Sequence, residues 1–133
     1  MAYKDSELQG TTPQTIRFIV PPGVVWHLQS LFVQMVPDTQ YGDHSVLVTQ
    51  VRQTTKALYS ISPASVQRGT SLFLTLGVGL SDSDTLSPGP IQYSVRAMQD
   101  IMMVQNDSIT VSGSGAGAAD TYLCTLTYEE ITL

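Results

Sequence analysis

Cysteine is almost absent from this 133-residue chain, which contains Cys124 alone. A single cysteine rules out a disulfide within the chain and any metal site that needs two cysteines of one chain. Cys124 lies among alternating apolar residues, which favours a small buried side chain over a reactive thiol. A chain of this length can bury roughly two thirds of its unfolded surface, so it can fold without such cross-links.

Charge is also sparse. Charged residues make up 13% of the chain, and the formal net charge is −5 at pH 7. The lysines and arginines are scattered and form no stripe that could follow a phosphate backbone, so direct binding to nucleic acid is not expected. Ser, Thr and Gln supply most of the polarity, which predicts a surface rich in uncharged hydrogen-bonding groups.

Long apolar runs are missing too. No stretch approaches the roughly 18 apolar residues of a membrane-spanning helix, so no membrane partner is expected. Residues 1–9 include Lys4, Asp5 and Glu7 with no apolar run behind them, which argues against a secretory signal. Residues 106–108 read Asn-Asp-Ser and fit a glycosylation site, but without a signal they are better explained as a polar turn between strands.

No set of catalytic or cofactor-binding residues is visible. His27 and His44 are the only histidines, and neither accompanies a nucleophile on a sharp turn or the ligand set of a zinc site. The glycine-rich residues 113–117 lack the lysine and the serine or threonine of a phosphate-binding loop. We therefore expect no enzyme, no cofactor and no catalytic role for either histidine.

Two pairs of aspartates could offer carboxylate oxygens to calcium. Asp38 and Asp43 fall in one polar segment, and Asp82 and Asp84 fall in another. Neither spacing matches the twelve-residue calcium loop. Aspartates of turns are the favoured interpretation, and no metal is expected.

Apolar side chains alternate with others in three segments, which is the period of two typical of a half-buried strand. Leu72 to Leu80 is the longest of these segments. In residues 91–98 the odd positions are apolar, and in residues 121–128 the even positions are apolar. No segment shows a helical period. With the turn signals between them, the expected strands are 15–20, 24–36, 45–53, 57–61, 72–80, 91–104 with a bend near 99–100, 109–111 and 121–131.

Eight or nine short strands predict an all-β fold, namely a two-sheet antiparallel β-sandwich of jelly-roll type. An immunoglobulin-like sandwich is the alternative, which the missing cysteine pair disfavours. We expect a single sandwich domain over residues 14–133. Residues 1–13 are polar and lack periodicity, which predicts an extended arm that leaves the body of the domain.

The segment 24–36 changes parity along its length. Trp26 and Leu28 share one parity, whereas the apolar residues after position 30 share the other. Keeping both sets on one face of a strand needs an extra residue, so a β-bulge is predicted near residues 29–30. Trp26 is then expected in the core with Leu28 and Phe18.

Three features carry a family resemblance: two short motifs, and between them a middle stretch that ends in a strand before a polar turn. Residues 21–28, Pro-Pro-Gly-Val-Val-Trp-His-Leu, are similar to an opening of the form P-x-G-x-x-W-x-(L/V). The ending, from Ala-Asp-Thr-Tyr at 119–122 to Thr-Tyr-Glu-Glu at 127–130, is similar to an alternating finish that closes on two glutamates. Over residues 21–130 the chain resembles a group of small virion proteins of tailed bacteriophages.

This resemblance implies a β-sandwich that decorates or cements a phage head, often as a homotrimer. Its implied partners are the major capsid protein or neighbouring virion proteins, together with other copies of itself. Its implied location is the virion, on the capsid surface, after synthesis in the cytoplasm of a bacterial host. Residues 99–103, Gln-Asp-Ile-Met-Met, lack the prolines and glycine often found there in the group, which leaves a head–tail connector or a tail component as the alternative.

Two segments are predicted to contact partners, because a polar segment with little apolar content gains order only by lying on another surface. The arm offers Tyr3, Lys4, Asp5 and Leu8, and the polar segment before the third strand offers Asp38, Tyr41 and His44.

A carbohydrate-binding jelly-roll module is the less favoured alternative function. Such sites commonly use aromatic platforms, and Trp26 suits a core better than a platform. Tyr41 and Tyr59 are then the aromatic residues left for this role.

Overall fold

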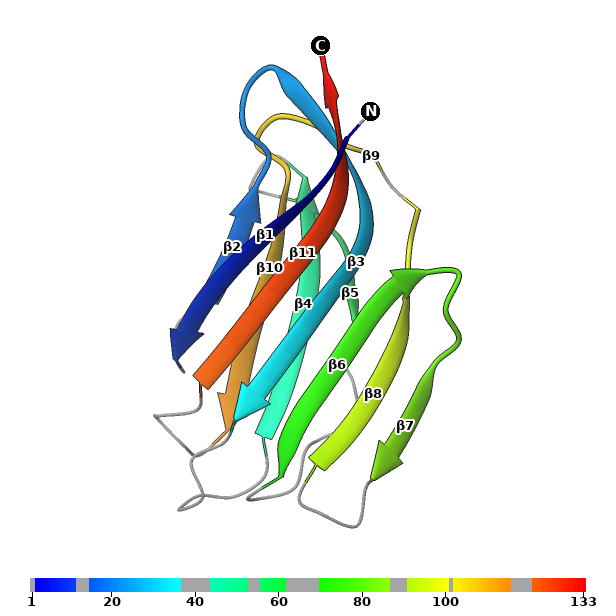
Figure 1. Ribbon diagram of the computed structural model, residues 1–133. Helices are drawn as coiled ribbons and strands as arrows, with labels where there is room; N and C mark the ends of the chain where they lie inside the picture. Colours follow the sequence, from blue (N-terminus) through cyan, green and yellow to red (C-terminus); the bar gives the residue numbers. More distant parts are fainter. Residues whose placement is uncertain are drawn as a thin grey trace.

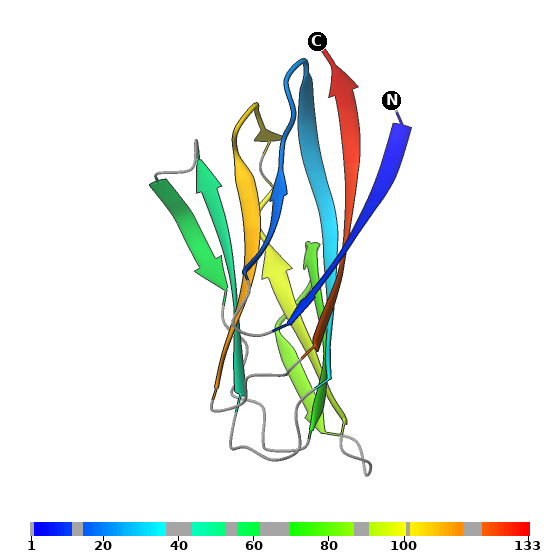
Figure 2. The ribbon, with the colours of Figure 1, turned by 90° about the vertical axis from the view of Figure 1, so that its left-hand side faces the viewer.

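The computed structural model describes residues 2–11, 15–36, 44–52, 56–61, 70–86, 91–100, 102–115 and 121–133. These residues form two β-sheets packed face to face (Figures 1 and 2). The predicted all-β, jelly-roll-like sandwich is thereby confirmed. Within these ranges no helix has the length and apolar character needed to cross a membrane.

One sheet has seven strands and the other has four. The larger sheet runs in the order β1 (Ala2–Thr11), β11 (Thr121–Thr132), β3 (Val24–Val36), β6 (Ser71–Val78), β8 (Ile91–Met98) and β7 (Ser83–Leu86), with β9 (Met102–Met103) also paired to β3. The smaller sheet runs in the order β2 (Thr15–Ile19), β10 (Ser108–Gly115), β4 (His44–Arg52) and β5 (Lys56–Ile61).

Side chains between the sheets form one apolar core. Strand parity decides which residues enter it, so Leu74 of β6 is fully buried while its neighbours Phe73 and Thr75 face the other way. The members of the core are Ile16, Phe18, Val20, Trp26, Leu28, Leu31, Val33, Met35, Val46, Val48, Leu72, Leu74, Leu76, Met98, Met103, Ile109, Val111, Tyr122, Cys124, Leu126 and Tyr128.

A β-bulge lies in β3 at the predicted place. Thr127 of β11 pairs with Ser30, and the next residue, Tyr128, pairs with Leu28, so the register skips Gln29. The extra residue lets apolar side chains on both sides of it face the core. Trp26 is buried as predicted, and its ring stacks on that of Tyr128 with 4.1 Å between the centroids.

One strand pair departs from the expected wholly antiparallel arrangement. β6 and β8 are parallel neighbours, and β7 pairs antiparallel with the far side of β8. The chain therefore leaves β6, forms β7, and returns so that β8 lies between the two (Figure 1). A period of two is the same in parallel and antiparallel strands, so the sequence carried no sign of this order.

Two edge strands were not expected, and they raise the count from eight or nine to eleven within the described residues. β1 pairs with β11 of its own chain in a ten-residue register, so the expectation that this segment leaves the sandwich is wrong for residues 2–11. β7 occupies residues expected to form a loop. Edge strands need no apolar face, which explains why neither sequence shows a period of two.

The turn between β9 and β10 is the polar turn that the sequence predicts at residues 106–108. Asn106 has a φ of 71°, a left-handed conformation that asparagine tolerates better than most residues. The Asp107 side chain is buried, and its Oδ2 accepts a hydrogen bond from the backbone N–H of Val104 at 3.0 Å and lies 3.5 Å from Nε of Arg52. These contacts tie the turn to β4.

Replacing Trp26 by alanine is expected to lower the free energy of unfolding by about 3 to 5 kcal/mol, because it removes a buried ring that stacks on Tyr128. Denaturant titration followed by circular dichroism measures this loss. Trp26→Phe is the control and should lose less, since it keeps an aromatic ring in the same place. An unchanged midpoint for Trp26→Ala would place this side chain outside the core.

Candidate interaction surface

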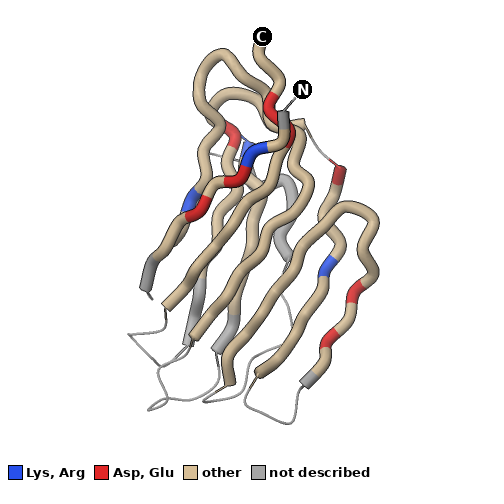
Figure 3. The backbone as a smooth tube through the Cα atoms, in the orientation of Figure 1, with Lys and Arg blue, Asp and Glu red and all other residues tan. Residues whose placement is uncertain are grey.

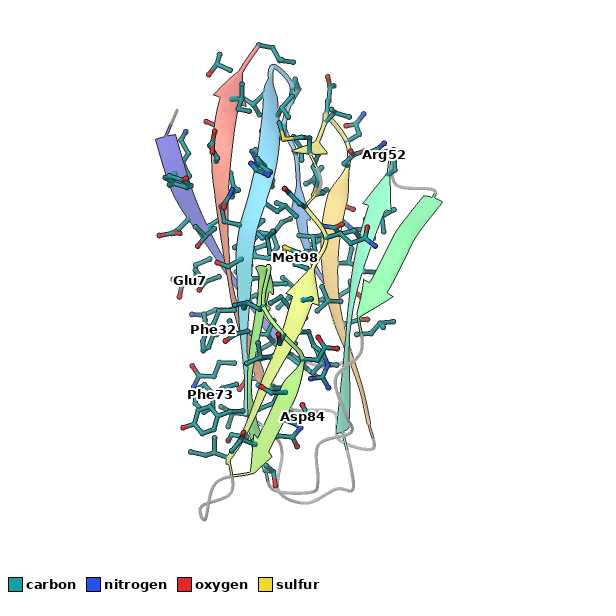
Figure 4. All side chains as sticks on the ribbon, turned by 90° about the vertical axis from the view of Figure 1, so that its right-hand side faces the viewer. Glu7, Phe32, Arg52, Phe73, Asp84 and Met98 are labelled. Carbon is teal, nitrogen blue, oxygen red and sulfur yellow. The ribbon has the colours of Figure 1, made fainter. Side chains whose placement is uncertain are left out.

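The outer side of the seven-stranded sheet, which faces away from the smaller sheet, carries an uncharged patch. We call it the aromatic face. It comprises Phe32, Gln34 and Val36 of β3, Phe73 and Thr75 of β6, Ile91, Tyr93 and Val95 of β8, and Leu123 and Thr125 of β11. Figure 4 shows Phe32 and Phe73 on this outer side, whereas Met98 points between the sheets.

Strand register places these side chains in two rows across the sheet. The first row runs through Gln9, Leu123, Gln34, Phe73 and Tyr93, from β1 to β8. The second row runs through Glu7, Thr125, Phe32, Thr75 and Val95. Because directly opposed residues in neighbouring strands share a face, both rows lie on one surface.

Three aromatic rings form a ladder within these rows. The Phe32 and Phe73 centroids are 6.1 Å apart, and the Phe73 and Tyr93 rings are stacked with centroids 5.5 Å apart. Tyr93 is 47% exposed and Val36 is 45% exposed. Rings in contact across strands hold one another in place, so the ladder forms an ordered apolar surface.

Charged residues lie around the aromatic face, and Glu7 is the one that stands in a row, at its β1 end. β3 and β6 contain no Lys, Arg, Asp or Glu, and the glutamates of β11 lie beyond the rows, at 129 and 130. In Figure 3 the charges of the described residues lie on β1, on β2 of the smaller sheet, along β7 and β8, and at the end of the sandwich near the termini. In a chain with a net charge of −5, this neutral surface is a distinct region.

A shallow hollow of about 230 Å³ adjoins the ladder at the β1 side. It is lined by Gln9, Gln34, Val36, Thr121, Tyr122 and Leu123. The register puts Leu123 between the two glutamines, so an apolar floor lies between amide groups. No lining residue is charged.

The aromatic face extends onto β8 because the apolar side chains of this strand point outward, whereas the sequence predicted that they enter the core. Its apolar set, which includes Tyr93 and Val95, faces outward, whereas Gln92 and Ser94 are buried. Gln92 donates to Ser94 Oγ at 3.1 Å, and that hydroxyl donates to Asp84 Oδ1 at 2.6 Å. Hydrogen bonding makes a polar inward face tolerable.

Arg96 completes this inward network. Its two terminal nitrogens donate to the two carboxylate oxygens of Asp84, each at 3.0 Å. The paired Arg96 guanidinium, and then the Ser94 hydroxyl, hold the pKa of Asp84 below its ordinary value. Asp82 accepts a hydrogen bond from the backbone N–H of Ala97 at 3.0 Å. Asp84 thus lies in β7, whereas Asp82 lies in the connection just before it, and both hold this edge against β8.

The predicted contact residues of the arm lie on β1. Tyr3 is 70% exposed and Leu8 is 40% exposed. Lys4 Nζ donates to Glu130 Oε2 at 2.5 Å, a contact that raises the pKa of Lys4 and lowers the pKa of Glu130. Asp5 Oδ1 accepts from Thr127 Oγ1 at 2.6 Å. Lys4 and Asp5 thus contact β11 of their own chain.

The other predicted contact residues are not brought into this surface. Asp38 and Tyr41 lie outside the described residues. His44 begins β4, on the smaller sheet, and its side chain and that of Tyr59 also lie outside what the structure describes.

The titratable groups that the structure describes form no catalytic or metal-binding set. They contain no group of three or more His, Cys, Asp or Glu side chains suited to a metal ion. Nε2 of His27 contacts Oδ1 of Asp100, an exposed pair with no nucleophile in it. Cys124 is fully buried as predicted, and burial raises the pKa of its thiol to about 12, which removes the thiolate at neutral pH.

The sequence does contain a sign of the aromatic face, but it is missed when only the residues that enter the core are considered. Phe32 and Phe73 are large aromatic residues in the positions that alternate with a complete apolar set. A strand with its core side already apolar gains nothing in the core from a phenylalanine on the other side. Such residues make this side of the sheet a candidate interaction surface.

Comparison with known proteins gives structural likenesses alone. No family model and no curated protein sequence matches the chain. Aligned over 98% of its length, the chain is similar to 57% of a chain in the nora virus structure, with 11% identity and a TM-score of 0.43. It is similar over 98% of its length to 80% of a turnip yellow mosaic virus chain, at 12% identity and a TM-score of 0.37.

A third likeness is to a chain of the sacbrood virus of honeybee, at 9% identity and a TM-score of 0.39, over 98% of this chain and 71% of that one. The chain spans little more than half of the nora virus chain. Likeness at these scores concerns general shape and assigns no function.

Asp84→Asn is expected to destabilise the fold by at most about 1 kcal/mol at pH 7, since exposed ion pairs contribute little. The pKa of Asp84 is lower in the folded protein than in the unfolded protein. Its contribution to the free energy of unfolding is therefore complete above the unfolded pKa, and it is lost as the pH falls through the folded pKa. Thermal unfolding of both proteins between pH 7 and pH 2 measures this. The two curves should converge at low pH. A constant difference would show that the Arg96 contact contributes nothing through charge.

Proposed function

We propose that this protein is a structural component of a virus particle and that it binds another virion protein through the aromatic face. The observation that carries the proposal is the neutral ladder of Phe32, Phe73 and Tyr93 on the outside of an acidic sandwich. Large exposed apolar patches on soluble proteins mark interaction sites. The centres of interfaces are likewise rich in aromatic residues and depleted of charge.

The size of this surface suits a protein partner. Strands spaced about 4.8 Å apart, with about 3.3 Å per residue along each strand, make the outer side of such a sheet roughly 25 Å by 25 Å. That projected area is of the order of the ~800 Å² that each partner contributes to a standard interface. The surface is formed by strands and not by loops, so binding need not order it first.

Within this class, we favour a decoration or cement protein on the head of a tailed bacteriophage, which self-associates, most simply as a trimer. The support is the resemblance of residues 21–130 to small phage virion proteins, together with the absence of catalytic machinery among the described residues. A head–tail connector or a tail component is the alternative within the same class.

Carbohydrate binding is a second candidate, which the hollow favours. Its walls carry the amides of Gln9 and Gln34, its floor is Leu123, and Phe73 follows in the same row. Uncharged hydrogen-bonding groups beside apolar carbons suit a neutral sugar. Gln34→Ala should abolish glycan-array binding if this candidate is correct, and the wild-type protein should bind no glycan if it is not.

The direct experiment compares binding to virus particles prepared without the protein. Phe73→Gln combined with Tyr93→Gln removes two rings of the ladder and is expected to weaken binding about 30-fold or more, because aromatic residues central to an interface typically contribute about 2 kcal/mol or more. Co-sedimentation with the particles over a concentration series measures the affinity. Binding should also change little between low and high salt, since the face is uncharged.

Ile19→Gln is the matched control. Ile19 of β2 is 47% exposed, as Tyr93 is, but it lies on the smaller sheet. Its replacement should leave binding unchanged. Equal loss in both variants, or none in either, would contradict the role of the aromatic face. Failure of the wild-type protein to bind heads, with binding to tails or connectors, would move the assignment to those parts of the particle.

A further inference from the structure

The outer edge of β1 is the longest of the sheet edges that the described strands form. β1 has ten residues, whereas the other outermost strands have four in β7, five in β2 and six in β5. Its register with β11 has no bulge, and residues 2–11 contain no proline. Bulges and prolines are two devices that keep other strands off an edge. Every second residue of β1 therefore points its backbone N–H and C=O away from β11 with neither device in the way.

The core side of β1 carries an apolar side chain that is only partly covered. Leu8 lies opposite Cys124, which is fully buried, so both side chains face the smaller sheet. Leu8 is nonetheless 40% exposed. β1 and β2 are edge strands on the same side of the sandwich (Figure 2), and no described strand of the larger sheet lies beyond β1. A strand added at this edge would cover more of Leu8.

The outward side of β1 is acidic. Asp5 and Glu7 alternate with Leu8 in parity, so they face the outer side of the sheet, and both are exposed. The one lysine of the strand, Lys4, shares the parity of Leu8 and already contacts Glu130. An added strand would therefore meet two carboxylates on one side of the sheet and an apolar side chain on the other.

Charge favours a basic strand over a second copy of this protein. Lys or Arg side chains at alternate positions would lie opposite Asp5 and Glu7, and opposite charges across a strand pair are stabilising. A second copy brings its own net charge of −5. Antiparallel pairing of two β1 strands centred on Ser6 opposes Asp5 with Glu7. Centred on Leu8, it opposes no like charges, but it sets Glu7 opposite Gln9 and supplies neither carboxylate with a cation.

We propose that the outer edge of β1 accepts an extended basic segment of another protein, which adds a strand to the larger sheet. The segment has lysine or arginine on the side of Asp5 and Glu7, and an apolar residue opposite Leu8. Backbone hydrogen bonds supply affinity in such strand addition, and the alternate side chains select the segment. This surface is separate from the aromatic face, so the proposal goes beyond the proposed function and does not depend on it.

The test titrates the isotope-labelled full-length protein with a capped synthetic peptide, Thr-Lys-Val-Lys-Thr-Lys-Val-Lys. Amide hydrogen exchange, followed by NMR, should slow at every second residue of β1, because only the N–H groups that point away from β11 gain a new acceptor. Attraction between charges without strand pairing would not produce this alternation. A peptide with glutamate in place of each lysine is the matched control and should not bind.

Glu7→Lys tests the charge of the edge. The side chain is exposed, so the variant should fold. It is expected to weaken binding of the lysine peptide about tenfold at low salt, because repulsion replaces an attraction of similar size. Added salt should reduce this loss. Asp100→Lys makes the same change of net charge at a residue that contacts His27 of β3, and should alter the affinity less than about twofold.

Three results would overturn the proposal: no binding of the lysine peptide, binding without alternating protection in β1, or equal losses in Glu7→Lys and Asp100→Lys. A second copy at this edge would overturn it too. That arrangement would appear as a dimer of the free protein, which Leu8→Cys combined with Cys124→Ala would lock by a disulfide between the two copies, because Leu8 would lie opposite its own counterpart. A monomer that forms no such disulfide leaves the edge to the basic strand.

Discussion

The bulge at Gln29 is the constraint on which the rest of the structure depends. β3 is the central strand of the larger sheet, paired with β11, β6 and β9. Without the extra residue, a period of two would send either Trp26 and Leu28, or the apolar residues after Ser30, to the outside. With it, both sets enter one core, and the side chains at the alternate positions point to the outer side of the sheet.

These outward-pointing side chains form the aromatic face. Phe32 follows the core residue Leu31, and Phe73 lies between two core leucines, so their outward direction is imposed by their neighbours. β8 then adds Tyr93 beside Phe73. The inward side of β8 is consequently polar, and it is stabilised by the hydrogen bonds that join Gln92, Ser94, Asp84 and Arg96. The sandwich thus has a second apolar surface, which no described strand covers.

Much of the fold could be predicted from the sequence, because burial on one side leaves a period of two. The bulge and the buried Trp26 were predicted from this period. The limits of β3 were predicted from the prolines and glycine beside it, and the turn at 106–108 from its polar residues. β1 and β7 were not, since an edge strand of exposed polar residues looks like a loop or an arm. The inward side of β8 was misjudged because its polar residues find partners on β7, and such tertiary hydrogen bonds leave no local pattern.

The candidate surface was harder to foresee than the core. The sequence directed attention to polar segments, with Tyr3, Lys4, Asp5 and Leu8 as contacts, and the structure instead places Lys4 and Asp5 against β11. A face made of four strands that are distant in sequence becomes visible only once their register is known. Asp38, Tyr41 and His44 stay predictions.

Hydroxyl-radical footprinting of the free and the particle-bound protein tests the central claim most directly, because it reports side-chain exposure residue by residue. The account predicts that Phe73 and Tyr93 lose most of their labelling on the particle, while Ile19 and Leu47, two exposed apolar residues of the smaller sheet, keep theirs. Protection of Ile19 and Leu47 with Tyr93 still labelled would contradict it.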